Sequence, residues 1–198
     1  MLNNFQTTIA NEIRFKGKGI HTGLEANVIL KPSESNTGIV FVRSDLSNSK
    51  KKNRIEAIAP NVSSTYFCTE LSNSDGVSVL TVEHLMAALA GARIDNIEVC
   101  IDGAEVPIMD GSSIKFIELI DKTGIVNLDK QSKFIKILKP IEIVKDESVA
   151  RFMPSDKSII EAEINFEHKE IGRQNIAFEF TPKVFRDQIA SARTFGFL

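Results

Sequence analysis

Tryptophan is absent from this chain of 198 residues, tyrosine occurs once and cysteine twice. The two cysteines, Cys68 and Cys100, each lie in an apolar, strand-like run, and their spacing gives no CxxC motif and no disulfide framework. The amino terminus lacks a basic segment followed by an apolar one, and nowhere do about 18 apolar residues follow one another. The sequence therefore predicts a soluble, cytoplasmic protein without stable membrane insertion.

An excess of charge of one sign is also missing, because 24 basic and 26 acidic residues give a net charge of −2. This balance provides no attraction for nucleic acid or for an anionic membrane, so no nucleic-acid partner is expected. The one basic cluster, Lys50 to Lys52 with Arg54, lies among polar residues and is interpreted as a solvated loop. The length suits one large domain or two small ones.

Short strands separated by glycine turns are predicted for the first 80 residues or so. The segments with this pattern are FQTTIANEIRF, EANVILKP, GIVFVRSDL, TYFCTEL and VSVL. The period then changes in TVEHLMAALAG, where Val82, Leu85 and Leu89 follow the spacing of one helix face. Thr81 is expected to cap this helix and Gly91 to end it.

A further strand, IDNIEVCID, and a second helix, SIKFIELIDKTG, are expected to follow. Asp110, Gly111 and Ser112 are placed to turn the chain and cap the second helix, and Gly124 is placed to close it. Residues 125–133 form a polar stretch, after which strand patterns resume in FIKILKPIEIVKD, SVARFMPS, SIIEAEINFEH and QNIAFEF. We therefore expect a first α+β domain over 1–128 and the first part of a second over 133–198.

The adjacent pair Glu83 and His84 falls in the first turn of the expected helix. Neighbouring helical residues point about 100° apart, yet both side chains can reach one cleft if the helix begins there. A carboxylate is favoured at that end by the helix dipole, and a neutral imidazole is a suitable zinc ligand. The alternative is that Glu83 only interacts favourably with the helix dipole and that His84 is a partly buried polar residue. The other histidines, His21 and His168, do not complete a ligand set by spacing.

Several motifs together resemble a known family. In order, they are GKGIHTG, NVSSTYFCTEL, TVEHLMAALAG with IDNIEV, EVPIMDGS, NFEH and SARTFGF. Their order and spacing are similar to those of the UDP-3-O-acyl-N-acetylglucosamine deacetylases of bacterial lipid A synthesis. The resemblance implies a zinc-dependent amide hydrolase that removes the N-acetyl group from a UDP-linked, acylated glucosamine and releases acetate. It also implies an α+β fold of two similar domains, each a β-sheet layered on a pair of α-helices.

The resemblance further implies roles for individual residues. Glu83 would be the general base, His84 a zinc ligand, and Thr194 would polarise the substrate carbonyl and stabilise the oxyanion. The remaining family positions would line the sugar and acyl site: Phe195 and Phe197 on one wall, with Tyr66, Cys68 and His21 on the opposing wall. A monomer with Zn²⁺ as its cofactor is expected.

One part of the family pattern does not occur in this chain. The family completes its zinc site with a histidine and an aspartate of an HKxxD motif and uses a later histidine as general acid. Here the only HK, at His168, is followed by Glu170, Ile171 and Gly172 and occupies the NFxH position instead. The chain is therefore expected to be a fragment truncated at its carboxyl end, with an incomplete second domain and no activity alone.

Two other interpretations stay open. The chain could be a catalytically inactive remnant that acts at most as a substrate-binding or partner-binding module. It could also be an unrelated α+β protein in which Glu83 and His84 are structural.

Overall fold

The computed structural model describes residues 5–195, and the chain divides into two compact units. Unit 1 comprises Met1–Ser132 and Arg186–Leu198, and unit 2 comprises Lys133–Phe185. The chain thus leaves unit 1 after Ser132 and rejoins it at Arg186.

A five-stranded sheet forms the centre of unit 1, in the order β2-β3-β9-β4-β5. Neighbouring strands are antiparallel, except that β4 and β9 are parallel. The strands are β2 (Ile13–Lys18), β3 (Glu25–Pro32), β9 (Ile97–Ile101), β4 (Ile39–Arg43) and β5 (Arg54–Glu56). In β3, Ala26, Val28 and Leu30 are buried and alternate with more exposed residues, which confirms the predicted half-buried strand.

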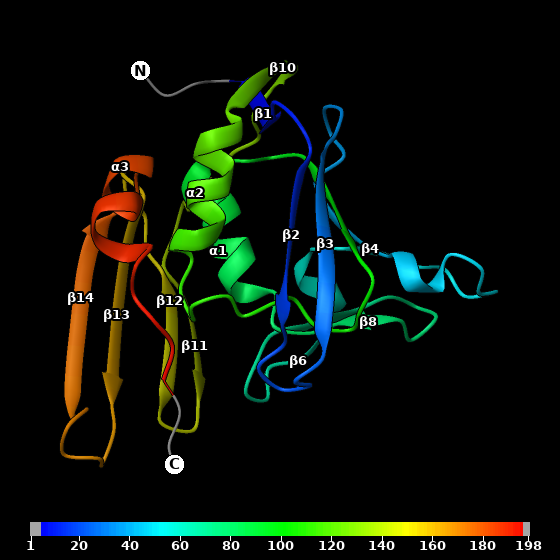
Figure 1. Cartoon of the computed structure of the whole chain (residues 1–198). Helices are drawn as coiled ribbons and strands as arrows, with labels where there is room; N and C mark the ends of the chain where they lie inside the picture. The colour runs from blue at the N-terminus through cyan, green and yellow to red at the C-terminus, as the bar shows by residue number, and fades with distance from the viewer. Residues whose placement is uncertain (1–4, 196–198) are drawn as a thin grey trace. The chain divides into compact units, whose positions relative to one another are not determined.

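Helices α1 (Glu83–Ala92) and α2 (Ile114–Thr123) lie side by side, on the same side of β2 and β3 in Figure 1. Leu85 and Leu89 of α1 are fully buried, as the helical spacing predicts. Phe116 of α2 packs edge-on against Phe15 of β2, with ring centroids 5.5 Å apart. These contacts join the helices and the sheet in one hydrophobic core.

The predicted ends of α1 were wrong. Thr81 does not cap the helix, because it has a left-handed φ of 58° and its hydroxyl donates to Glu105 instead. Gly91 lies inside the helix, and the left-handed residue that follows the last turn is Arg93, with a φ of 60°. Tertiary contacts of Thr81 therefore override its local capping preference.

The predicted ends of α2 fit the structure better. The hydroxyl of Ser112 accepts a hydrogen bond from the Ile114 N–H at 3.2 Å, and the Asp110 carboxylate accepts from the Ser112 hydroxyl at 2.8 Å. Gly124 follows the last turn with a φ of 87°, and its N–H donates to the carbonyl of Ile120. A residue with a side chain would be strained at this φ.

Two small sheets complete unit 1. The first pairs β1 (Phe5–Ile9) with β10 (Ile125–Gln131), and the second is formed by β6 (Val62–Ser64), β7 (Glu70–Ser72) and β8 (Ser78–Val79). Single 3-10 turns occur at Ser44–Leu46 and Ala59–Asn61. The polar stretch at 125–133 contains a strand that the sequence did not predict, because β10 is antiparallel to β1. Backbone pairing does not require apolar side chains on an exposed strand.

Unit 2 contains the four strands predicted from the alternating patterns beyond residue 133. They form two antiparallel hairpins, β11 (Ile141–Lys145) with β12 (Ser148–Phe152) and β13 (Ile159–Asn165) with β14 (Arg173–Glu179). A short helix α3 (Pro182–Val184) and a π-helical turn (Phe185–Ile189) follow. With separate sheets and helices in the chain, the predicted α+β class is confirmed.

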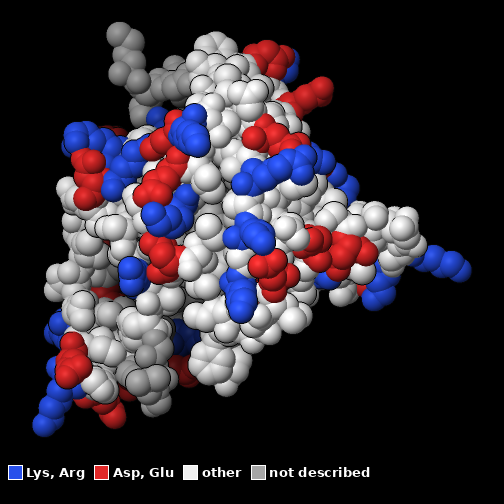
Figure 2. Space-filling view, in the orientation of Figure 1, with Lys and Arg blue, Asp and Glu red and all other residues white. Residues whose placement is uncertain are grey.

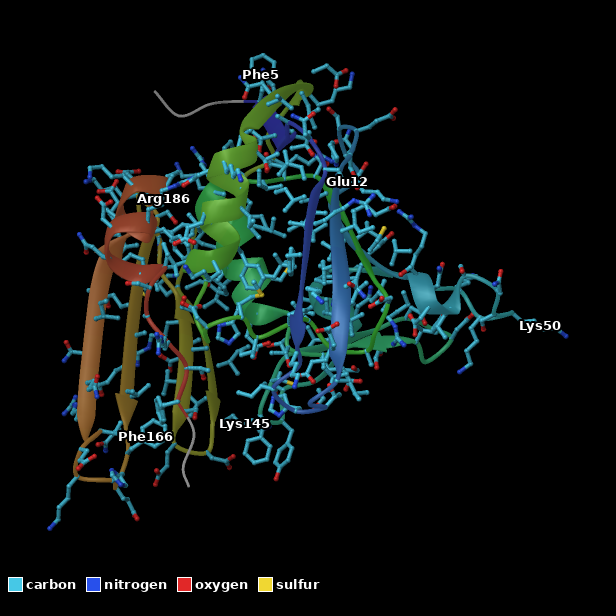
Figure 3. All side chains as sticks on the ribbon, viewed as in Figure 1. Phe5, Glu12, Lys50, Lys145, Phe166 and Arg186 are labelled. Atoms are coloured by element: carbon cyan, nitrogen blue, oxygen red, sulfur yellow. The ribbon has the colours of Figure 1, made fainter. Side chains whose placement is uncertain are left out.

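Charged side chains of both signs are interspersed over the face shown in Figure 2. Lys50 projects from the loop between β4 and β5 (Figure 3), as expected for a solvated residue. Arg54, which was assigned to the same loop, instead lies in β5 and pairs with Glu98 at 2.5 Å. Within residues 5–195, none of the helices has the length and apolar character needed to cross a membrane.

Candidate active site

Glu83 is the first residue of α1, and its side chain is half-buried. Its Oε2 accepts a hydrogen bond from the backbone N–H of Thr69 at 3.0 Å, which holds the carboxylate against the loop that precedes β7. No other hydrogen bond to this carboxylate occurs within the described part of the chain, so Oε1 is free to accept a proton.

His84 follows in the same turn, and its side chain is also half-buried. The hydroxyl of Ser113, next to the start of α2, donates to the main-chain carbonyl of His84 at 3.0 Å. Ser113 itself is buried. This bond fixes the first turn of α1 against the turn before α2.

Tyr66 and Cys68 lie in the loop between β6 and β7, close in sequence to the Thr69 N–H that binds Glu83. The Tyr66 side chain is 77% exposed, and its ring lies 4.2 Å from that of Phe67, measured between centroids. Cys68 is buried, so its side chain presents no surface to a ligand. Of the two, Tyr66 is the one available to a ligand.

His21 lies in the turn between β2 and β3 and is exposed. Its backbone N–H donates to Oε1 of Glu105 at 2.9 Å, and that of Thr22 donates to Oε2 at 2.7 Å. The Thr81 hydroxyl, at the approach to α1, also donates to Oε1 of Glu105, at 3.0 Å. The position of the His21 turn is therefore set through Glu105.

Glu105 itself was not recognised as a site residue from the sequence, although it begins the EVPIMDGS motif. Burial raises the pKa of this carboxyl, but the hydrogen bonds from His21, Thr22 and Thr81 outweigh burial and hold its pKa below the usual value. Its partners lie 24 to 84 residues away in the chain, so no local pattern reveals them. Its place in the EVPIMDGS motif was the signal that could have identified it.

Thr194 belongs to the segment that rejoins unit 1 at Arg186. Its backbone N–H donates to the carbonyl of Gly111 at 2.9 Å, and the Ser113 N–H donates to the carbonyl of Ala190 at 3.0 Å. The guanidinium of Arg186, labelled in Figure 3, binds both carboxylate oxygens of Asp121 in α2, at 2.9 and 2.6 Å. Thr194 is thus held at the turn before α2.

The turn Asp110–Ser113 therefore contacts both halves of the expected site: Ser113 binds the His84 carbonyl and Gly111 binds the Thr194 N–H. The Thr194 side chain is exposed, and no hydrogen bond joins it to the Glu83 carboxylate among residues 5–195. Phe195 is 54% exposed, whereas Phe197 lies outside the described residues.

The described side chains do not provide a complete set of metal ligands. Catalytic zinc usually takes three protein ligands. Across the described range 5–195, no group of three or more His, Cys, Asp or Glu side chains is placed to hold a metal ion. His84 is thus a single candidate ligand, and these residues do not by themselves form a zinc centre.

Residues 6–198 match the family model described as LpxC, UDP-3-O-acyl N-acetylglycosamine deacetylase. The chain belongs to this family. A protein of Brucella melitensis biotype 2 named UDP-3-O-acyl-N-acetylglucosamine deacetylase is 41% identical over 197 residues, which cover 100% of this chain and 68% of the relative. Proteins of the same name from Brucella ovis and Brucella suis are each 40% identical over the same share. The family membership predicted from the linked motifs is confirmed.

Proposed function

We propose that this chain takes part in removing the N-acetyl group from UDP-3-O-acyl-N-acetylglucosamine in lipid A synthesis. The observation that carries the proposal is the family match over residues 6–198, within which Glu83 and His84 begin helix α1. The segment that bears Thr194 is bound to the same turn that holds His84. Relatives named for this deacetylation share about two fifths of their residues with the chain along its whole length.

Glu83 is the general base of the proposed reaction. Water adds to the acetamide carbonyl carbon while Oε1 of Glu83 accepts its proton, and Oε2 stays bound to the Thr69 N–H. The carbon–nitrogen bond then breaks, the sugar nitrogen takes up a proton, and acetate leaves. A carboxylate fixed by a backbone donor keeps one oxygen aimed at the water, which reduces the entropy lost in the reaction.

Thr194 is the donor to the substrate oxygen. Its hydroxyl is exposed, and its backbone is fixed at Gly111, so the hydroxyl can donate to the oxygen that becomes negative when water adds. A donor already held in place at a developing oxyanion lowers the barrier by several kcal/mol, commonly about 3.

His84 contributes one ligand to the Zn²⁺ that we propose as cofactor. A bound zinc ion supplies Lewis acidity and lowers the pKa of a bound water. The Ser113 bond to the His84 carbonyl supports this role, because it fixes the helical turn that carries the imidazole. Since His84 is the single candidate among residues 5–195, we expect the 198-residue chain alone to bind no stoichiometric zinc and to show no turnover.

The substrate surface is proposed to include His21 and Tyr66 on one side and Phe195 and Phe197 on the other, with Cys68 beneath the first. Exposed aromatic rings at Tyr66 and Phe195 suit an acylated sugar, which needs apolar contact beside polar groups. Two buried free thiols support a reducing, cytoplasmic location, and a monomer is proposed.

The test is acetate release from UDP-3-O-acyl-N-acetylglucosamine. The chain is assayed alone and as a chimera in which residues 1–198 are followed by the unmatched remainder of the Brucella melitensis relative. We expect the chimera to release acetate and Thr194→Val to lower kcat about a hundredfold, with Thr194→Ser close to the unaltered chimera. Thr123→Val, on the outer end of α2, is the matched control.

Zinc content separates the role of His84 from a folding defect. We expect His84→Ala to lower zinc stoichiometry in the chimera while the melting temperature changes little. An active chimera with full zinc after His84→Ala would contradict the ligand role. A chimera that folds and binds zinc but releases no acetate would contradict the proposed function and support a binding module without catalysis.

A further inference from the structure

The carboxylate of Glu105 is the most fully bonded buried acid among the described residues. The residue is 2% exposed and accepts hydrogen bonds from the His21 N–H, the Thr22 N–H and the Thr81 hydroxyl, at 2.7 to 3.0 Å. None of the proposed chemical steps uses it. A buried carboxylate is stable only when donors replace the water that it has lost.

The three donors come from two separate parts of unit 1. His21 and Thr22 belong to the turn between β2 and β3, whereas Thr81 lies two residues before Glu83. The backbone around Glu105 reinforces this link, because Leu80 donates to the Ala104 carbonyl and Val106 donates to the Leu80 carbonyl. Glu105 therefore ties the His21 turn to the residues that lead into α1.

The surroundings are shaped to admit this carboxylate. Thr81 has a left-handed φ of 58°, a conformation that is unfavourable for a β-branched residue and is stabilised here by its hydrogen bond. A side chain at Gly19 would place its Cβ 2.5 Å from Cδ of Glu105, so the carboxylate would have to leave its present position. The strained backbone of Thr81 and the absence of a side chain at Gly19 both favour one defined position for the Glu105 carboxylate.

We propose that Glu105 is a positioning residue that fixes the His21 turn relative to Glu83. It thereby holds the substrate surface at a constant distance from the general base. The proposal rests on the proposed function for its consequence in catalysis, whereas the link between the turn and α1 stands on the hydrogen bonds alone. Thr81 and Glu105 act as one unit in this account. Loss of either should therefore release the His21 turn.

The first experiment measures amide hydrogen exchange and amide proton shifts by NMR in the 198-residue chain. In Glu105→Gln we expect the His21 and Thr22 amides to exchange at least tenfold faster and their proton resonances to move upfield. Exchange in β3 and β9 should stay within about twofold. Glu98→Gln is the matched control, because Glu98 is a partly buried carboxylate of β9 that binds Arg54 rather than the turn.

Thr81 supplies the decisive comparison, since it makes no hydrogen bond to His21 or Thr22 in the described structure. We expect Thr81→Ala to accelerate exchange of those two amides at least threefold, and Thr81→Ser to restore protection. The double variant Glu105→Gln with Thr81→Ala should be no faster than Glu105→Gln alone. Unchanged protection in Thr81→Ala, or rates that multiply in the double variant, would overturn the proposal even if Glu105→Gln fails to fold.

The second experiment measures kcat and KM for UDP-3-O-acyl-N-acetylglucosamine in the chimera. We expect Glu105→Gln and Thr81→Ala to raise KM and lower kcat, Thr81→Ser to recover both, and Glu98→Gln to change neither. Full activity in a variant whose turn exchanges faster would overturn the positioning role. If the His21 turn exchanges faster in the variants but no chimera releases acetate, the deacetylase function would be contradicted. The link between the His21 turn and α1 through Glu105 would still be supported.

Discussion

The two units of the chain differ in what covers their strands. In unit 1, Phe41 of β4 and Ile101 of β9 are fully buried, and two helices supply part of the cover. In unit 2, Ile143 is 67% exposed and Phe152 is 63% exposed, although both lie in a regular hairpin. Backbone pairing alone thus produces strands in both units, but only in unit 1 are the strands covered by a hydrophobic core. Hairpins without a covered face are marginally stable in water.

Hydrogen exchange should show the largest difference between the units. We expect amides of β3 and β9 to open only with global unfolding, at about 5 kcal/mol or more. Amides of β11 to β14 should open at about 2 kcal/mol or less, because their strands bury little apolar area. Equal protection of the amides in both units, measured by NMR at one pH, would contradict this expected difference in stability.

A matched pair of phenylalanines tests the same difference by mutation. Phe41→Ala should lower the free energy of unfolding of unit 1 by about 3–5 kcal/mol, because it leaves a cavity in the core. Phe152→Ala, on an exposed strand of unit 2, should change stability by no more than about 0.5 kcal/mol. Urea titration followed by circular dichroism checks both values, and a large effect of Phe152→Ala would show that its ring is covered in solution.

Residue patterns predicted much of this fold because its main elements are specified locally. The alternation of Ala26, Val28 and Leu30 identified β3, and the helical spacing of Leu85 and Leu89 identified α1. The strand β10 was missed because its exposed side chains carry no alternation, and its pairing with β1 joins residues more than 100 positions apart.

The candidate site was only partly predictable for the same reason. Glu83 and His84 stand out by residue type and by their place at a helix start, and Thr194 entered through a linked motif. Glu105 and Ser113 act through backbone groups that are distant in sequence, which no local pattern reveals.

A smaller effect is expected from Ser113, which joins the two helices of unit 1. Ser113→Ala removes its hydroxyl bond to the His84 carbonyl and should destabilise unit 1 by about 1 kcal/mol. Ser148→Ala, on exposed β12, is the control and should lie within about 0.5 kcal/mol of the unaltered chain. Identical urea midpoints for Ser113→Ala and Ser148→Ala would show that the Ser113 hydroxyl does not help to fix α1.

Acid should destabilise unit 1 through Glu105. The pKa of Glu105 lies below its usual 4.5 in the folded chain, because donors outweigh burial, so this carboxylate stabilises the fold above pH 4.5. That contribution should be lost as the pH falls through the lowered pKa. Melting temperatures between pH 6 and pH 3 should therefore fall less steeply in Glu105→Gln, and parallel curves would contradict this reading.

The smallest effect is expected from the exposed ion pairs of unit 2. Glu179 binds Lys157 at 2.8 Å and raises the pKa of that lysine, so any stabilisation is present below pH 10.5 and lost at higher pH. Because both side chains face solvent, salt should screen the pair. Exchange rates of β13 and β14 amides should change by less than about twofold in Lys157→Met, and a larger change would show that the pair is more than a surface contact.

The central claim is that Glu83 at the start of α1 is the base of an amide hydrolase. It is tested most directly by kcat/KM for acetate release in the chimera, with Glu83→Gln set against Glu118→Gln on the exposed face of α2. We predict a loss of at least about a hundredfold for Glu83→Gln and no change for Glu118→Gln. Equal rates for Glu83→Gln and the unaltered chimera would contradict it.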